Sequence, residues 1–203
     1  MNTKKKNDKI KEKMIYNIIL ELCYGIKEIH KNNLIHRDLK PENIFLTSNM
    51  KIKIGDFGIT KQLKNVNDYA KTLVGTYLYM APEIINGEKY NTKVDIWALG
   101  CIIHELCTLN YCFNGSSLSA LMNRILECKY EKIDSKNYGL DLQNLIDLLL
   151  KENYKQRPII DEVIKIINKN VDLPLFGEKV QLFLEDEVYQ NKLIENNIFK
   201  SIN

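Results

Sequence analysis

The sequence lacks several features that would point to particular classes of protein. Its five cysteines form no C-x-x-C pair and no secretory pattern opens the chain, so we expect reduced, intracellular thiols and no cysteine metal site. No apolar run approaches the length of a membrane span, which predicts a soluble, cytoplasmic protein without a membrane partner. The net charge is only +3, which argues against a nucleic-acid partner.

What the sequence does contain is enough apolar material for one globular core. The chain has 203 residues, of which 45% are hydrophobic, and this length is too short for several domains. Residues 1–9 include the run Lys4–Lys6, which we interpret as part of a solvated or disordered tail rather than as a binding segment.

Hydrophobic periodicity predicts a mainly α-helical protein with a small β hairpin. Apolar residues recur at steps of three and four between residues 10 and 33, which predicts one long amphipathic helix. Two short apolar stretches follow at residues 44–46 and 52–54, with Asn49 between them. This arrangement is typical of two strands joined by a tight turn.

The later part of the chain predicts a buried central helix. Residues 92–107 are apolar on nearly every face, and Thr92 with Asp95 suits the helix start because both side chains can accept from free backbone N–H groups. Further helices are expected at residues 117–128, 140–152 and 158–169, the last with Pro158 in its first turn. Residues 171–203 are more charged and predict a C-terminal extension that is partly helical.

Polar residues of one loop carry the chemistry. The stretch HRDLKPEN at residues 36–43 contains Asp38, Lys40 and Asn43, and Asp56 opens the triplet DFG further along. A phosphoryl transfer needs a cation with oxygen ligands and a carboxylate aligned with the attacking hydroxyl. We therefore expect Asp38 to orient a substrate hydroxyl and accept its proton, and Lys40 to steady the phosphate. Asn43 and Asp56 would hold Mg²⁺.

These motifs, together with two others, resemble those of a known family. HRDLKPEN, DFG at 56–58 and APE at 81–83 stand in the order of the protein-kinase signatures. Over residues 10–170 the chain resembles the C-terminal lobe of a eukaryotic protein kinase. Lys40 is typical of serine/threonine kinases, and the strings TLVGTYLYMAPE and DIWALGCIIHELCTL resemble the NIMA-related (NEK) kinases. Tyr77 departs from the proline commonly found there. The resemblance implies an ATP- and Mg²⁺-dependent enzyme acting on a protein substrate.

The resemblance also assigns structural roles. It implies that His36 and Phe57 pack together in a hydrophobic spine below the active site. Asp95 would hold the backbone of the catalytic loop, although a simple helix-start cap is the alternative and both can hold. Glu83 and Arg157 match a buried ion pair that anchors the activation segment, a structural role and not a catalytic one.

Other positions match nucleotide-binding and regulatory residues of kinases. Phe45 would contact the nucleotide, and Thr76 would bond the catalytic aspartate and lysine. Thr72 lies where related kinases are often phosphorylated, and Arg37 could pair with that phosphate. Tyr69 is a second candidate for phosphorylation. For these three hydroxyl-bearing residues an ordinary loop or solvent-facing hydroxyl remains the alternative.

One part of a kinase has no counterpart in the sequence. A kinase N-lobe carries a glycine-rich loop, a strand lysine and a helix glutamate, but the nine glycines contain no G-x-G pair and only nine residues precede the first helix. We therefore expect the C-lobe only, inactive by itself. Either the N-lobe is supplied in cis or in trans, or the chain is a catalytically silent, kinase-like binding module. The intact set Asp38, Lys40, Asn43 and Asp56 favours the first hypothesis.

Overall fold

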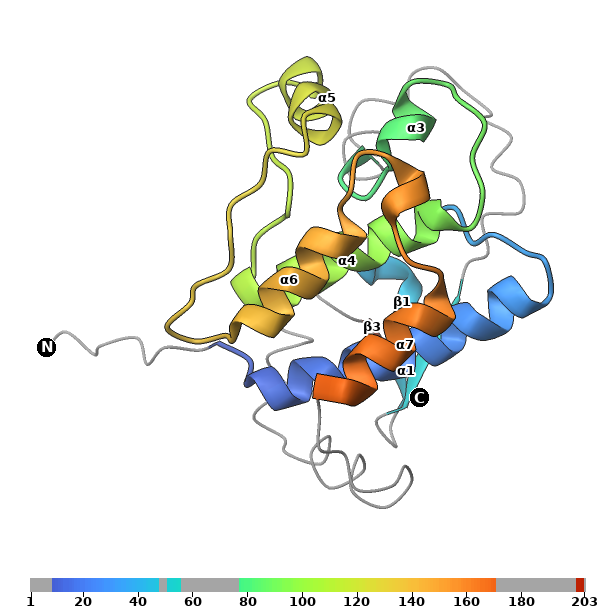
Figure 1. Ribbon diagram of the computed structural model, residues 1–203, viewed down its shortest axis with the longest axis vertical. Helices are drawn as coiled ribbons and strands as arrows, with labels where there is room; N and C mark the ends of the chain where they lie inside the picture. The colour runs from blue at the N-terminus through green and yellow to red at the C-terminus, as the bar shows by residue number, and fades with distance from the viewer. Residues whose placement is uncertain (1–8, 48–50, 56–76, 171–199, 203) are drawn as a thin grey trace, which may run out of the picture.

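The computed structural model describes residues 9–47, 51–55, 77–170 and 200–202, and this part is mainly helical with one small sheet (Figure 1). The α-helices are α1 (Glu12–Lys31), α3 (Pro82–Ile85), α4 (Lys93–Thr108), α5 (Leu118–Leu126), α6 (Leu140–Leu149) and α7 (Ile160–Asn170). The 3₁₀ helices are η1 (Pro41–Asn43) and η3 (Tyr154–Gln156), and the strands are β1 (Ile44–Thr47), β2 (Ile52–Ile54) and β3 (Lys200–Ile202). The expectation of a mainly helical fold with a small hairpin is confirmed.

Helix α4 lies at the centre of the core. Thirteen of its sixteen residues are buried, as its apolar residues on every face predict. Its fully buried Trp97 stacks on Phe113 with ring centroids 5.5 Å apart and planes inclined by 5°. Helices α1 and α6 pack against α4, and Figure 1 shows α7 running beside α1. The buried helix therefore provides a rigid base for the segments that precede and follow it.

Helix α1 joins this core to the hairpin. Its apolar residues recur on one face and include the fully buried Ile15, Ile19 and Ile26. The helix contacts α4 and α7, and also β2, whose edge it closes with a side chain. Glu21 Oε2 accepts a hydrogen bond of 2.8 Å from the backbone N–H of Ile52. This contact fixes the hairpin to the helix.

The sheet contains one strand that the sequence did not predict. Strands β1 and β2 pair antiparallel, with Ile44 opposite Ile54 and Phe45 opposite Lys53, as expected for a hairpin. On the other side of β1, β3 pairs in parallel, which gives the order β2-β1-β3. The expectation of helix within residues 171–199 lies outside the described residues.

Two details of the expected helix starts differ from the structure. The side chain of Thr92 makes no cap hydrogen bond, and Asn91 Oδ1 instead accepts from the Lys93 N–H at 2.9 Å. Pro158 lies before α7 rather than in its first turn, because the helix begins at Ile160. Thr92 is therefore the N-cap residue of α4 as expected, although without a side-chain hydrogen bond, whereas α7 begins later than expected.

The cysteines and the lengths of the helices also bear on the class of protein. All five cysteines are free thiols; Cys128 is partly buried and the other four are fully buried. Among the helices of the described ranges, none has both the length and the apolar character needed to cross a membrane.

Candidate active site

The loop between α1 and β1 is fixed by a buried carboxylate. Asp95, in the first turn of α4, accepts from the His36 N–H through Oδ2 and from the Arg37 N–H through Oδ1, both at 3.0 Å. Arg37 has a left-handed backbone with φ of 69°, which is unfavourable for a residue with a Cβ. The two hydrogen bonds that Asp95 accepts stabilise the left-handed conformation of Arg37, immediately before Asp38.

His30, which the sequence analysis did not identify, completes this anchor. His30 Nε2, at the end of α1, lies 2.8 Å from Asp95 Oδ2. The pair is separated by 65 positions, and no motif or spacing in the sequence relates them. His30 therefore belongs to the support of the loop, and only the packing of α1 against α4 identifies it.

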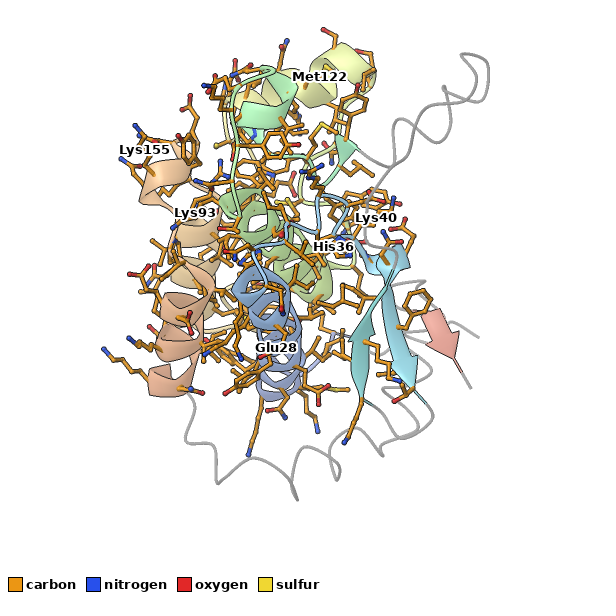
Figure 2. All side chains as sticks on the ribbon, turned by 90° about the vertical axis from the view of Figure 1, so that its right-hand side faces the viewer. Glu28, His36, Lys40, Lys93, Met122 and Lys155 are labelled. Atoms are coloured by element: carbon orange, nitrogen blue, oxygen red, sulfur yellow. The ribbon has the colours of Figure 1, made fainter. Side chains whose placement is uncertain are left out.

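The structure brings three of the predicted site residues together. Lys40 Nζ lies 2.9 Å from both carboxylate oxygens of Asp38. Asn43 Nδ2 donates to the Asp38 carbonyl at 2.7 Å and to Asp38 Oδ2 at 3.1 Å. The side chains of Asp38 and Lys40 are 24% and 13% exposed, so the group is fixed by the protein but still open to solvent. Figure 2 shows Lys40 and His36 beside the upper end of the hairpin.

The chain leading to the DFG motif is held against this loop. The Gly55 N–H donates to the Asn43 carbonyl at 2.9 Å, and His36 Nε2 lies 2.9 Å from the Gly55 carbonyl. A Cβ on Gly55 would lie 2.7 Å from the ring of Phe45, so a larger residue there would have to displace that ring. Asp56 itself, with Phe57, Tyr69, Thr72 and Thr76, lies outside the described residues.

Arg37 points its charge toward the surface. Its guanidinium lies over the ring of Tyr90, 5.7 Å from the ring centroid, near the outer limit of a cation–π contact. Arg37 is exposed, and Tyr90 is 39% exposed. An exposed guanidinium next to Asp38 is available to an anionic group from solvent or from the chain.

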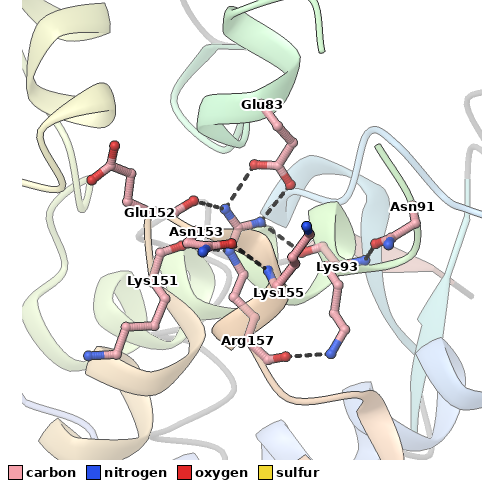
Figure 3. A network of polar contacts seen from close by, with 8 residues as sticks. All are labelled: Glu83, Asn91, Lys93, Lys151, Glu152, Asn153, Lys155 and Arg157. Atoms are coloured by element: carbon pink, nitrogen blue, oxygen red, sulfur yellow. Dashed lines mark hydrogen bonds and ion pairs between the residues drawn. The ribbon is translucent and has the colours of Figure 1, made fainter. Parts of the chain in front are cut away.

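Glu83 and Arg157 form a bidentate buried ion pair (Figure 3). Arg157 Nη1 lies 2.7 Å from Glu83 Oε1 and Nη2 lies 2.8 Å from Oε2, with side-chain exposures of 0% and 3%. The same guanidinium donates to the backbone carbonyls of Lys93, Lys151 and Glu152. The pair therefore joins the start of α3 to the start of α4 and to the segment that follows α6.

Sequence reasoning missed a second pair of polar residues. The Tyr79 hydroxyl donates to Glu105 Oε2 at 2.6 Å, where α4 passes below the segment before α3. Burial raises the pKa of Glu105 to about 7; the bond from Tyr79 opposes this shift and the nearby Glu42 carboxylate adds to it. Burial likewise raises the pKa of Tyr79. Tyr79 lies before α3 and outside any periodic stretch, and Glu105 lies in a helix that is apolar on nearly every face, so no local pattern relates the two residues.

The protein kinase domain model matches residues 1–166. The chain belongs to the protein kinase family.

Individual relatives identify the group of protein kinases that the chain resembles. The chain is 36% identical to mouse "Serine/threonine-protein kinase Nek1" over 154 residues, which is 76% of this chain and 13% of that protein. It is 36% identical to human Nek5 over 182 residues, 89% of this chain and 25% of that protein. It is 42% identical to the "Probable serine/threonine-protein kinase nek3" of Dictyostelium discoideum over 161 residues, 76% of this chain and 14% of that protein. The resemblance to NEK kinases is confirmed, and the chain spans no more than a quarter of these relatives.

The ion pair of this kinase domain should be a large term in its stability. Glu83→Gln leaves the buried Arg157 guanidinium without its countercharge, and we expect a loss of ~3–5 kcal/mol in the free energy of unfolding. Urea denaturation followed by circular dichroism measures it. The control is Asp161→Asn, which breaks the exposed pair with Lys27, with side-chain exposures of 48% and 40%. We expect the control to cost less than ~1 kcal/mol, and equal losses in the two variants would contradict the assignment.

The raised pKa of Glu105 predicts a stability that falls with pH. The folded state holds this proton up to about pH 7, whereas the unfolded chain releases it near the ordinary value of 4.5. Between these values the folded state binds more protons, so the free energy of unfolding decreases as pH rises. Because Glu105 keeps some solvent exposure, we expect a change on the order of 1–3 kcal/mol.

Glu105→Gln removes the titration but keeps an oxygen acceptor for the Tyr79 hydroxyl. We expect this variant to lose the decrease between pH 5 and pH 8 and to be more stable than the wild type at pH 8. Denaturation curves at both pH values measure the difference. The exposed Glu28→Gln serves as the control and should keep the wild-type slope. A wild-type slope in Glu105→Gln would show that another group titrates.

Proposed function

We propose that the chain is the C-terminal lobe of a serine/threonine protein kinase domain. In this proposal it transfers the terminal phosphoryl group of ATP to serine or threonine hydroxyls of a protein substrate, with an N-lobe supplied in cis or in trans. The observation that carries the proposal is the joint placement of Asp38, Lys40 and Asn43 on a loop that Asp95 fixes. The family and the names of the relatives support it.

Each polar group has a proposed part in the transfer. Asp38 orients the substrate hydroxyl and accepts its proton. Lys40, held between both Asp38 oxygens, steadies the phosphate that is transferred. Asn43 uses its amide nitrogen to bond Asp38, so its carbonyl oxygen is the atom suited to a cation. That oxygen and the Asp56 carboxylate fit the hard oxygen ligands of Mg²⁺, which neutralises phosphate charge when bound. Phe45 would contact the bound nucleotide.

The proposal also includes regulation. A phosphate on Thr72 would carry about −1.5 to −2 charge and could pair with the exposed guanidinium of Arg37. Thr76 would bond Asp38 and Lys40, and Phe57 would pack on His36. Free thiols throughout the chain are consistent with the cytoplasmic location that we propose.

The second candidate is a catalytically silent, kinase-like binding module. The absence of any G-x-G pair among the nine glycines favours it, since a glycine-rich loop normally covers the nucleotide phosphates. The retention of Asp38, Lys40 and Asn43 in bonded geometry favours the kinase, because a module that only binds has no need of this arrangement.

The test is a phosphoryl-transfer assay on the chain extended with a kinase N-lobe. We expect Mg²⁺- and ATP-dependent labelling of serine or threonine, and a loss of at least ~10²-fold in kcat for Asp38→Asn, which removes the proton acceptor and keeps the shape. The control is Asp134→Asn, at an exposed aspartate paired with Lys9, which should keep the wild-type rate. Folded protein without transfer, or a wild-type rate in Asp38→Asn, would favour the binding module.

The 203-residue chain alone should not turn over ATP at a kinase-like rate. Phosphoryl transfer depends on positioning, and the nucleotide would have only one wall to contact. The measurement uses labelled ATP, Mg²⁺ and a generic serine/threonine substrate, with Asp38→Asn as the blank. Transfer clearly above that blank would show that this lobe positions the nucleotide without a second one.

A further inference from the structure

The edge of β1 that faces away from β2 is paired with β3, which lies far along the sequence. Figure 2 shows α1, β2, β1 and β3 in succession, with β3 on the side of the hairpin away from α1. β3 pairs in parallel with β1 in the register Phe45 to Lys200, Leu46 to Ser201 and Thr47 to Ile202. We call the side of β1 that faces β3 the β1 edge.

The hydrogen-bond pattern identifies which backbone groups form the β1 edge. The Thr47 N–H donates to the Lys51 carbonyl at 3.0 Å and the Gly55 N–H to the Asn43 carbonyl at 2.9 Å, so residues 43, 45 and 47 face β2. Because strand residues alternate, Leu46 directs its N–H and carbonyl toward the β1 edge. Leu46 is only 2% exposed. This burial includes the cover by β3, which supplies the partner that these polar groups need in place of water.

The opposite edge of the hairpin, formed by β2, is closed in a different way. There the Ile52 N–H, on β2, donates to the Glu21 carboxylate of α1. That edge is closed by a side chain from the rigid core, whereas the described structure closes the β1 edge with the backbone of β3. The hairpin is thus closed by a side chain on one edge and by the backbone of Lys200–Ile202 on the other.

We propose that the β1 edge is a strand-docking site and that its occupant is the chain's own segment Lys200–Ile202. Recognition of this kind uses main-chain hydrogen bonds, for which a short extended segment suffices. Residues 171–199 join this segment covalently to α7, so its pairing with β1 is intramolecular and does not depend on the protein concentration. The segment therefore has an advantage over a second copy at micromolar protein.

Docking also acts on the candidate active site. β1 begins immediately after Asn43, and β3 contacts η1, which contains Asn43. Holding β1 in place therefore holds Asn43, whose amide bonds Asp38, and Phe45, whose ring lies against Gly55. The C-terminal segment is thus a positioning element for the Mg²⁺ and nucleotide residues, a consequence that rests on the proposed kinase function.

The test compares amide hydrogen exchange in the full chain and in a chain that ends at residue 199. We expect the Leu46 amide to exchange at least ~10-fold faster in the shortened chain, because its partner strand is gone. The amide of Ile102, fully buried in α4, reports whether the shortened chain is folded and should not change. Equal Leu46 rates in the two chains would overturn the docking.

Two point variants separate backbone pairing from side-chain contacts. Ile202→Pro removes a main-chain N–H and should reproduce the fast exchange at Leu46, while Ile202→Ala keeps the backbone and should retain most of the protection. A peptide of residues 198–203 should restore protection to the shortened chain when added in excess. Failure of both Ile202→Pro and the peptide would mean that pairing with this segment does not protect Leu46.

The remaining outcomes decide which segment occupies the β1 edge and whether its docking acts on the candidate active site. Protection of Leu46 that falls on dilution of the full chain would assign the edge to a second copy and overturn docking in cis. The Asn43 side-chain amide protons should also exchange faster in the shortened chain, and no change there would overturn the positioning role. None of these measurements uses nucleotide or kinase activity, so their failure is distinct from failure of the proposed function.

Discussion

The carboxylate of Asp95 is the contact on which the geometry of the site depends. It lies at the start of the central helix, 1% exposed, and three donors or potential donors surround it: the N–H groups of His36 and Arg37, and His30 Nε2. A helix N-terminus also favours a negative charge. These contacts hold Arg37 in a left-handed conformation that an isolated residue would leave, at a cost of ~1–3 kcal/mol. The direction of Asp38 follows from that fixed backbone.

From this anchor the site is assembled by hydrogen bonds that mostly have a main-chain group as one partner. Gly55 donates to the Asn43 carbonyl and its own carbonyl meets His36, so the loop, the hairpin and the approach to Asp56 form one unit. These hydrogen bonds fix the positions of the main-chain segments, and glycine at position 55 leaves room for the ring of Phe45. The polar side chains Asp38, Lys40 and Asn43 are then free to interact with each other on a fixed frame.

The sequence predicted features that depend on local pattern or on a contiguous motif. The burial of α4, the long helix α1 and the hairpin follow from periodicity, and the family followed from HRDLKPEN and its companions. The contacts of His30 with Asp95 and of Tyr79 with Glu105 could not be predicted, because each joins residues far apart on helices or loops whose packing no local pattern specifies. The strand at Lys200–Ile202 was missed for the same reason: three residues carry no period, and only the unpaired edge of β1 gives them a structure.

Three carboxylates in or beside α4 show how the same charge is handled in different surroundings. Asp95 is compensated by backbone N–H groups and a histidine, and Glu83 by the bidentate guanidinium of Arg157. Glu105 has neither; its partner is the neutral hydroxyl of Tyr79, and Glu42 adds a second negative charge nearby. Because a hydroxyl offsets desolvation only in part, the pKa of Glu105 rises to about 7, and this carboxylate gains or loses its proton near neutral pH. Glu42 belongs to the same HRDLKPEN loop as Asp38, so the protonation of Glu105 alters the electrostatic potential at the loop that carries the proposed chemistry.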